Sequence, residues 1–266
     1  MLGWAYWTAI SDPVVREVEL ALLPVNSSSS SLRVLLMTDI HVAGPDMPPS
    51  RLQRIVSQAN ALKPDMVVIT GDLVSDKLPA TRIYSLQAAI APLARLESSL
   101  GVFAVLGNHD HWRNAAAARR ALKNGGIWVL DNSAVAAGPI AVGGLDDRLT
   151  GHEDLGRTLD AMGKTRGVSI LLSHSPDPFP ELPSRVRLMV AGHTHCGQIR
   201  VPLLGAYSYA SRYGDRYGCG VVREKGKTLI VSAGLGTSIL PLRIGAVPDM
   251  WLITLRKPTS TRVSRP

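Results

Sequence analysis

The sequence alternates short apolar runs of strand length with polar turns, and amphipathic stretches separate the first of these runs. Residues 32–37, 66–69 and 102–106 are apolar runs, and the stretches between them repeat apolar residues at helical spacing. This order of buried strand, turn and helix is typical of parallel βαβ units, whose strands all end at one edge of a sheet. The chain is therefore expected to be an α/β protein in which polar residues at the strand ends meet in one pocket.

Five turns that follow apolar runs carry aspartate, asparagine or histidine. Side chains two residues apart on an extended strand end point the same way, so an Asp-x-His or His-x-His turn can direct both ends at one metal ion. A carboxylate can bridge two ions, and oxygen and nitrogen ligands without a thiolate favour Mn, Zn or Fe. We therefore expect two divalent metal ions, held by Asp39, His41, Asp72, Asn108, His174, His193 and His195.

The turn Gly107-Asn108-His109-Asp110 also suggests a proton donor. His109 stands beside the ligand Asn108 but need not bind metal itself. An imidazole held by a carboxylate such as Asp110 can hydrogen-bond a phosphate oxygen and protonate a leaving group. Two ions a few ångströms apart stabilise the in-line displacement at phosphorus, with a metal-bound hydroxide as the nucleophile. His109 and Asp110 are accordingly the predicted catalytic residues.

Length and composition favour one globular domain. With 266 residues, 45% apolar and 19% charged, the chain can bury a single large core. Residues 1–31 are expected to form an N-terminal apolar segment and a serine-rich linker, residues 32–256 the catalytic domain, and residues 257–266 a disordered tail. We expect a monomer.

The net charge of +8 favours an anionic partner, such as a phosphorylated small molecule or a lipid. The basic residues are dispersed and no aromatic-interleaved basic stripe is present, so no specific nucleic acid is expected. Two cysteines are too few for a disulfide framework, which fits a reducing compartment but leaves a single disulfide open.

The N-terminus is apolar and rich in tryptophan, but its apolar run is too short to span a bilayer. Tryptophan and tyrosine prefer membrane interfaces, so residues 1–24 are a candidate for peripheral membrane contact. Packing of this segment on the domain is the equal alternative.

Taken together, these motifs resemble the signature of the calcineurin-like metallophosphoesterases over residues 32–255 approximately. The resemblance implies a four-layer α/β/β/α sandwich with the site at one edge of the paired sheets. It also implies that His109 is the proton donor, supported by Asp110. The implied first ion is held by Asp39, His41, Asp72 and His195, and the second by Asp72, Asn108, His174 and His193.

The stretch 192–199, with 234–237 and 241–243 downstream, resembles the membrane-associated bacterial branch of this family. Members of that branch often carry an N-terminal anchor, and they include enzymes acting on lipid-linked phosphodiesters and UDP-diacylglucosamine. Cys196 departs from the pattern, because glycine is usual there. The departure places a thiol beside a ligand, where it could be inert, oxidisable or in contact with metal.

The predicted function is hydrolysis of a phosphodiester or pyrophosphate of a membrane lipid or lipid precursor such as UDP-2,3-diacylglucosamine, at the bacterial cytoplasmic membrane or in the cytoplasm. A soluble nucleotide or nucleic-acid phosphodiesterase is the alternative. A metal-stabilised scaffold without turnover is less favoured, because it has no use for an unliganded acid beside the metals. Candidate substrate contacts are Arg212, Tyr213 and Arg243, with an ordinary surface hairpin as the equal alternative for the first two.

Overall fold

The computed structural model describes residues 2–75, 77–201, 205–206 and 208–258. Two six-stranded sheets form the centre of the molecule. In spatial order the first sheet contains β1 (Val14–Ala21), β14 (Asp249–Arg256), β2 (Ser31–Met37), β3 (Met66–Thr70), β4 (Val102–Val105) and β5 (Trp128–Val129). The second contains β12 (Gly220–Glu224), β13 (Lys227–Val231), β9 (Val186–Ala191), β8 (Val168–Leu172), β7 (Ile140–Gly144) and β6 (Ser133–Ala137).

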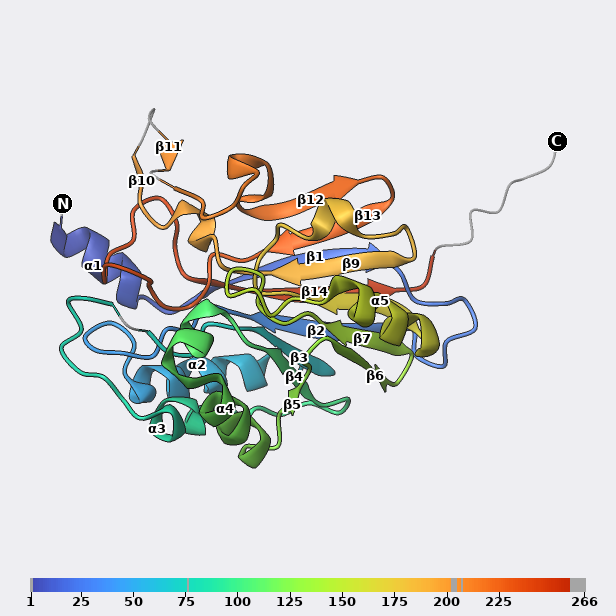
Figure 1. The fold of residues 1–266 in the computed structure, drawn as a ribbon, viewed down its shortest axis with the longest axis horizontal. Coiled ribbons are helices and arrows are strands. Elements are labelled where there is room, and N and C mark those ends of the chain that lie inside the picture. The colour runs from blue at the N-terminus through green and yellow to red at the C-terminus, as the bar shows by residue number, and fades with distance from the viewer. Residues whose placement is uncertain (1, 76, 202–204, 207, 259–266) are drawn as a thin grey trace.

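Helices cover the outer faces of both sheets, which confirms the α/β/β/α sandwich (Figure 1). The first sheet is covered by α2 (Pro49–Ala61), α3 (Leu86–Ile90) and α4 (Asn108–Asn124), and the second by α5 (Leu155–Lys164). A short N-terminal helix, α1 (Leu2–Ile10), and a hairpin of β10 (Arg200–Val201) and β11 (Gly205–Ala206) lie at the end where the site forms.

Both faces of the central strands are buried, as their apolar runs predict. In β2 the side chains of Leu35 and Met37 pack against the helices, whereas Val34 and Leu36 pack between the two sheets. Alternate residues of a strand point to opposite faces, so a continuous apolar run serves two cores at once. Strands β2 to β5 are parallel, and so are β7, β8, β9 and β13, which brings their carboxyl ends to one edge.

Some elements differ from the sequence analysis. Strand β1 lies in the segment 1–31 that was set apart from the domain, yet it pairs along its length with β14 as the edge of the first sheet. The amphipathic stretch between residues 69 and 102 forms only a short α3, which is followed by a 3-10 segment, Ala91–Arg95, that contains Pro92. The expected C-terminal tail falls mostly on residues 259–266, outside the described residues. No helix in the described ranges is long and apolar enough to span a membrane.

Candidate metal centre

The seven predicted ligands lie together where the two sheets end. Asp39 and His41 follow β2, Asp72 follows β3, and Asn108 opens α4 after β4. From the second sheet, His174 follows β8, and His193 and His195 follow β9. Helix α4 begins at Asn108, so both Asn108 and His109 belong to its first turn. The site is therefore built from five loops of two sheets.

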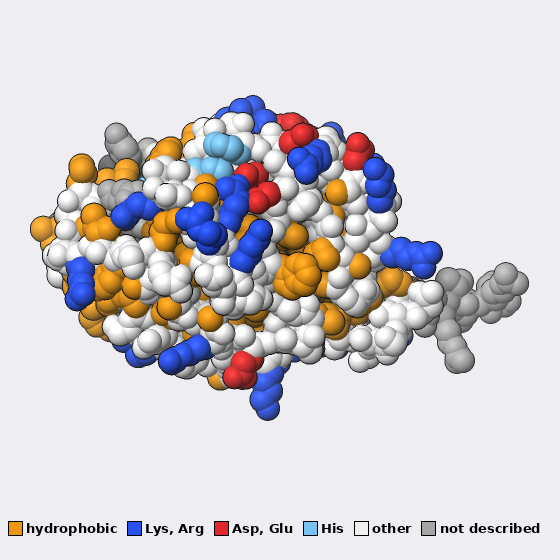
Figure 2. Space-filling view, turned by 60° about the horizontal axis from the view of Figure 1, so that its bottom comes forward, with side chains coloured by type: hydrophobic (Ala, Val, Ile, Leu, Met, Phe, Trp, Pro, Cys, Tyr) orange, Lys and Arg blue, Asp and Glu red, His pale blue; other side chains and the backbone are white. Residues whose placement is uncertain are grey.

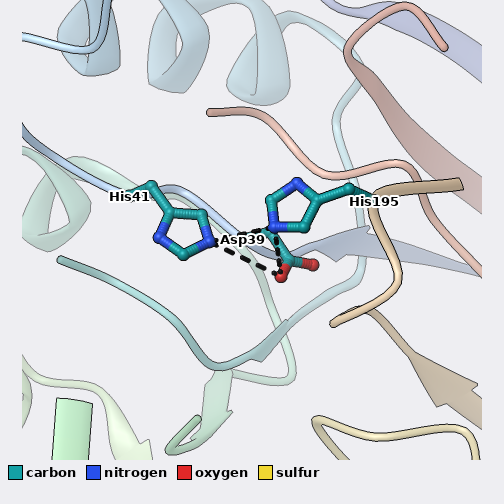
Figure 3. A group of neighbouring side chains, drawn as sticks. All are labelled: Asp39, His41 and His195. Atoms are coloured by element: carbon teal, nitrogen blue, oxygen red, sulfur yellow. Dashed lines mark hydrogen bonds and ion pairs between the residues drawn. The ribbon is translucent and has the colours of Figure 1, made fainter. Parts of the chain in front are cut away.

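Asp39, His41 and His195 form one group able to hold an ion (Figure 3). The Nε2 atoms of the two histidines lie 3.0 Å apart, and Nε2 of His195 lies 3.3 Å from Oδ1 of Asp39. Figure 3 shows both ring nitrogens directed at the space beside the carboxylate. Two imidazole nitrogens converging on a buried carboxylate fit a cation between them, because all three donor atoms are those that bind divalent ions.

A second group adjoins the first through Asp72. Oδ2 of Asp72 lies 3.4 Å from Nε2 of His41 and 3.3 Å from Nε2 of His174. The same His174 nitrogen lies 3.1 Å from Oδ1 of Asn108 and 3.1 Å from Nδ1 of His193. Asp72 thus stands between the two groups, in the place that a bridging carboxylate requires.

The backbone at the ligands is strained. Asp39, His41, Asp72, His193 and His195 all have φ between 47° and 68°, in the left-handed region. A non-glycine residue pays roughly 1–2 kcal/mol for that conformation. Such residues persist where the surrounding fold holds them and where a site needs the geometry.

Two glycines allow the turns to approach one another. A Cβ at Gly107 would lie 2.7 Å from the backbone nitrogen of Asp72, and a Cβ at Gly192 would collide with the carboxylate of Asp39 and the hydroxyl of Thr38. Neither contact leaves room for a side chain. The chain therefore approaches neighbouring segments closely at both glycines.

Burial and neighbouring charge set the protonation of the ligands. Desolvation lowers the pKa of His41 and of His195 well below the usual value, and it lowers the pKa of His193 to about 4. Burial would also lower the pKa of His174, but the carboxylates of Asp72 and Asp39 outweigh it and raise this pKa to about 10. Three of the histidines are thus neutral at pH 7, the form that binds metal.

The pKa values of Asp39 and Asp72 shift in opposite directions. Burial raises the pKa of Asp39 to about 6. Burial would raise that of Asp72 too, but His174 and His41 hold the pKa of Asp72 well below its usual value. The carboxylate placed between the two groups is therefore the one that stays ionised most firmly.

His109 faces the same space. Its backbone N–H donates to Oδ1 of Asp72 over 2.9 Å, and its ring makes an edge contact with His41 at 4.9 Å between centroids. Asp110 differs from its predicted role. Its two carboxylate oxygens accept the backbone N–H groups of Leu73 and Gly107, so these hydrogen bonds hold the turn that carries His109.

The site opens into a pocket of 490 Å³. Asp72, Asn108, His109, His193 and His195 line its floor. The rim is apolar: the exposed side chains Leu78, Trp112, Leu149 and Ile239 also line the pocket. This rim could not be predicted, because nothing local in the sequence shows that three separate loops and helix α4 surround one opening.

The three predicted substrate contacts do not line the pocket. Arg243 is fully buried and its guanidinium donates to the carbonyls of the loop 233–246, so its prediction as a phosphate contact is wrong. Arg212 is exposed and faces Asp177 at 3.6 Å, and Tyr213 packs against Tyr217. None of the three lines the pocket.

Three other polar features came only from the structure. Lys77 is buried at the pocket and donates to both carboxylate oxygens of Asp46 and to Thr237. His111 does not face the ligands and pairs with Asp146 at 2.8 Å. Cys196 and Cys219 form a disulfide, the single bridge that the sequence analysis left open.

Comparison with known proteins agrees with this geometry. The family described as Calcineurin-like phosphoesterase matches residues 32–197. An uncharacterized metallophosphoesterase of Bacillus subtilis, YkuE, is 34% identical over 77% of this chain and 72% of its own length. An uncharacterized metallophosphoesterase of Helicobacter pylori is 29% identical over 96% of this chain and 68% of its own length.

A third relative is longer. The Danio rerio protein named "Transmembrane protein with metallophosphoesterase domain" is 32% identical over 94% of this chain, which spans 59% of that protein. Proteins of this family generally use two divalent metal ions, and the two adjoining ligand groups described above accommodate such a pair. The chain belongs to the calcineurin-like phosphoesterases and is a metal-dependent phosphoester hydrolase.

Proposed function

We propose that the protein hydrolyses a phosphodiester or pyrophosphate bond of a lipid or lipid precursor with two divalent ions in its pocket. The observation that carries the proposal is the convergence of seven oxygen and nitrogen ligands, four of which line the floor of a pocket whose rim is apolar. When bound, the ions supply Lewis acidity and a nucleophile at neutral pH. Asp39, His41, Asp72 and His195 would hold one ion, and Asp72, Asn108, His174 and His193 the other.

Within this proposal His109 protonates the leaving oxygen. It faces the ligand groups from the pocket floor, and the first turn of α4 fixes its backbone through the hydrogen bond to Asp72. The carboxylate of Asp110 positions that turn by accepting hydrogen bonds from the backbone of Leu73 and Gly107. A general acid placed in this way contributes about 10²–10⁴-fold to the rate.

The test compares Asp72→Ala, His193→Ala and His109→Gln against a chromogenic phosphodiester. The first two variants should lose turnover and bound metal. His109→Gln should lose about 10²-fold or more in kcat while elemental analysis still finds both ions. Full activity of Asp72→Ala would overturn the site, and loss of metal from His109→Gln would mean that His109 is a ligand.

The lipid part of the proposal rests on the rim. Leu78 is 94% exposed and Ile239 68% exposed, although both stand beside a highly polar site. A water-soluble nucleotide gains nothing from these contacts, whereas an acyl chain next to the phosphate buries them. The alternative, a soluble nucleotide phosphodiesterase, predicts that Leu78→Ser and Ile239→Ser leave KM unchanged for every substrate.

The discriminating experiment measures KM for a nucleotide-linked diacyl lipid and for a cyclic nucleotide. Under the proposal, Leu78→Ser/Ile239→Ser raises KM for the lipid about tenfold and leaves that for the nucleotide unchanged. Exposed Val25, which is remote from the pocket lining, gives the matched control Val25→Ser. Turnover of the nucleotide alone would favour the alternative.

Peripheral membrane contact belongs to the same proposal. On α1 the side chains of Leu2, Trp4 and Trp7 are exposed by 72%, 57% and 65%. Figure 2 shows hydrophobic side chains gathered at the left end of the molecule, the end that α1 occupies in Figure 1. Trp4→Ala/Trp7→Ala should weaken sedimentation with anionic vesicles and spare hydrolysis of the soluble phosphodiester. Equal sedimentation of both proteins would remove α1 from the proposal.

A further inference from the structure

A covalent bond that the proposed chemistry does not use ties down the loop that carries His195. Cys196 directly follows His195 and forms a disulfide with Cys219, 23 residues further along the chain, with 4.7 Å between the Cα atoms. On the other side of His195, the hydroxyl of Thr194 donates to the carbonyl of Gly218 over 2.8 Å. Both neighbours of His195 are therefore fastened to the same segment, at the start of β12.

The backbone of this loop needs such support. Four consecutive residues have left-handed φ: 49° at His195, 52° at Cys196, 76° at Gly197 and 24° at Gln198. Only one of them is glycine, and other residues rarely adopt this region. Two turn hydrogen bonds, from Gly197 to Thr194 and from Gln198 to His195, lie within the loop. At the far end of the loop, the side-chain amide of Gln198 donates to the carbonyls of Leu240 and Leu242. Cys196 itself, next to His195, is fastened to another segment by its disulfide.

The orientation of the His195 ring depends on its backbone more than that of the His174 ring does. Nδ1 of His195 is buried without a hydrogen-bond partner among the described residues. By contrast, Nδ1 of His174 lies 2.7 Å from the carbonyl oxygen of Thr70, which fixes that ring. Histidines that bind metal are usually oriented through their second nitrogen. At His195 the loop geometry has to supply the orientation.

The disulfide is also accessible. Cys196 is only 2% exposed, but Cys219 lies at an exposed position. Both cysteines line a cavity of 270 Å³, together with Trp4, Arg16 and Arg200, and none of the seven candidate ligands lines it. A small reductant can therefore reach the bond without passing through the metal site.

We propose that the Cys196–Cys219 disulfide positions His195, so that the ion held by Asp39, His41 and His195 binds tightly only in the oxidised protein. The inference rests on the metal site of the proposed function. In the reductive step the S–S bond breaks and the reductant gives two electrons. A dithiol also gives the two protons of the new thiols and leaves as a disulfide. With a phosphine, one water molecule supplies the two protons and the oxygen of the phosphine oxide. Without the S–S bond, Cys196 and His195 can leave their left-handed conformation, which would move the His195 ring away from Asp39 and His41.

The test is calorimetric titration of metal-free protein with Mn²⁺, without substrate, before and after treatment with a phosphine reductant. Oxidised protein should bind two ions, and reduced protein should bind one of them at least about tenfold more weakly, the usual size of the effect of losing a ligand's support. Reoxidation should restore the affinity. Cys196→Ser/Cys219→Ser should match the reduced protein with and without reductant, which controls for metal binding by the reductant.

The outcomes separate the inference from the site on which it rests. If both redox states bind two ions with equal affinity, the disulfide has no positioning role while the metal site stands. Equal weakening of both ions, with a loss of circular-dichroism signal, would show a general loss of structure and would also overturn the inference. Failure of the oxidised protein to bind any ion would overturn the metal site and this inference together. Where the double variant does not fold, reduction of the folded protein carries the test.

Discussion

Arg243 shows how a single residue can be essential without touching a substrate. Its side chain is fully buried, and the guanidinium donates to the carbonyls of Ala233, Gly234, Gly236 and Ala246. Burial lowers the pKa of Arg243 to about 10, so it stays charged at neutral pH. In the loop that Arg243 holds together, the N–H of Gly236 donates to the carbonyl of Asp39. The loop therefore supports the turn that carries Asp39.

Truncation of this side chain is expected to destabilise the whole protein. Arg243→Ala leaves several buried carbonyls without a donor, at about 1–3 kcal/mol each, so the free energy of unfolding should fall by about 3 kcal/mol or more. Urea denaturation measures the change. Arg212→Ala, at an exposed position, is the matched control and should change stability by less than about 0.5 kcal/mol. Equal effects of the two would contradict the structural role of Arg243.

His174 makes metal binding depend on pH. With the pKa of His174 at about 10, the metal-free protein carries a proton on this ring at pH 7.5. The ion needs the neutral imidazole, so binding must release that proton and affinity should rise with pH from neutrality towards 10. Calorimetry in buffers of different ionisation enthalpy should find about one proton released through His174. The same release in His174→Gln would disprove the assignment.

At the scale of elements, the site depends on how closely two turns from different sheets pack. Gly192 directly follows β9. A Cβ atom at this position would collide with the carboxylate of Asp39, which follows β2. The N–H of His193 donates to both carboxylate oxygens of Asp39, at 3.1 and 2.9 Å. The close packing of these two turns therefore depends on the absence of a side chain at Gly192 and on two hydrogen bonds from His193.

Gly192→Ala should displace the Asp39 carboxylate and weaken metal binding. We expect a loss of about tenfold or more in affinity for one ion, comparable to the loss of a group that supports a ligand. Metal titration measures it, and Gly163→Ala in α5, where a Cβ meets nothing within 4 Å, is the control. Unchanged affinity in Gly192→Ala would show that the turns can separate without cost.

At the scale of the whole molecule, the ions would join the two sheets. Asp39, Asp72 and Asn108 come from loops of the first sheet, and His174 and His193 from loops of the second. An ion bound only by the folded arrangement stabilises it by mass action, by about 2.7 kcal/mol when the metal is at 100 times its Kd.

Chelation should accordingly lower the thermal unfolding temperature of the protein by about 5 °C or more, given a shift of about 2–4 °C per kcal/mol for a domain of comparable size. Scanning calorimetry with and without a chelator measures this shift, and one transition should be seen in both because the ions link both sheets. Asp72→Ala should show no response to the chelator. A chelator shift in that variant equal to that of the parent would place the stabilising metal elsewhere.

The sequence alone was sufficient for the fold class and for a set of candidate ligands that the structure brings together. Continuous apolar runs bounded by Asp39-x-His41, Gly71-Asp72 and similar turns predict buried parallel strands, and parallel strands bring their ends together. Local hydrophobic pattern and ligand chemistry both act over a few residues, so they can be read along the chain. Strand β1 was not predicted, because this edge strand contains charged residues and lacks a continuous apolar run.

Only the tertiary structure decided which residues do not belong to the site and which support it. Arg243 and Arg212 look alike in the sequence, yet one is enclosed by backbone carbonyls and the other faces solvent. The apolar rim and the Cys196–Cys219 bond likewise join loops that are distant along the chain. Chemistry at a strand end is a local property, whereas the direction of a long side chain and the neighbour of a cysteine are fixed by packing between segments.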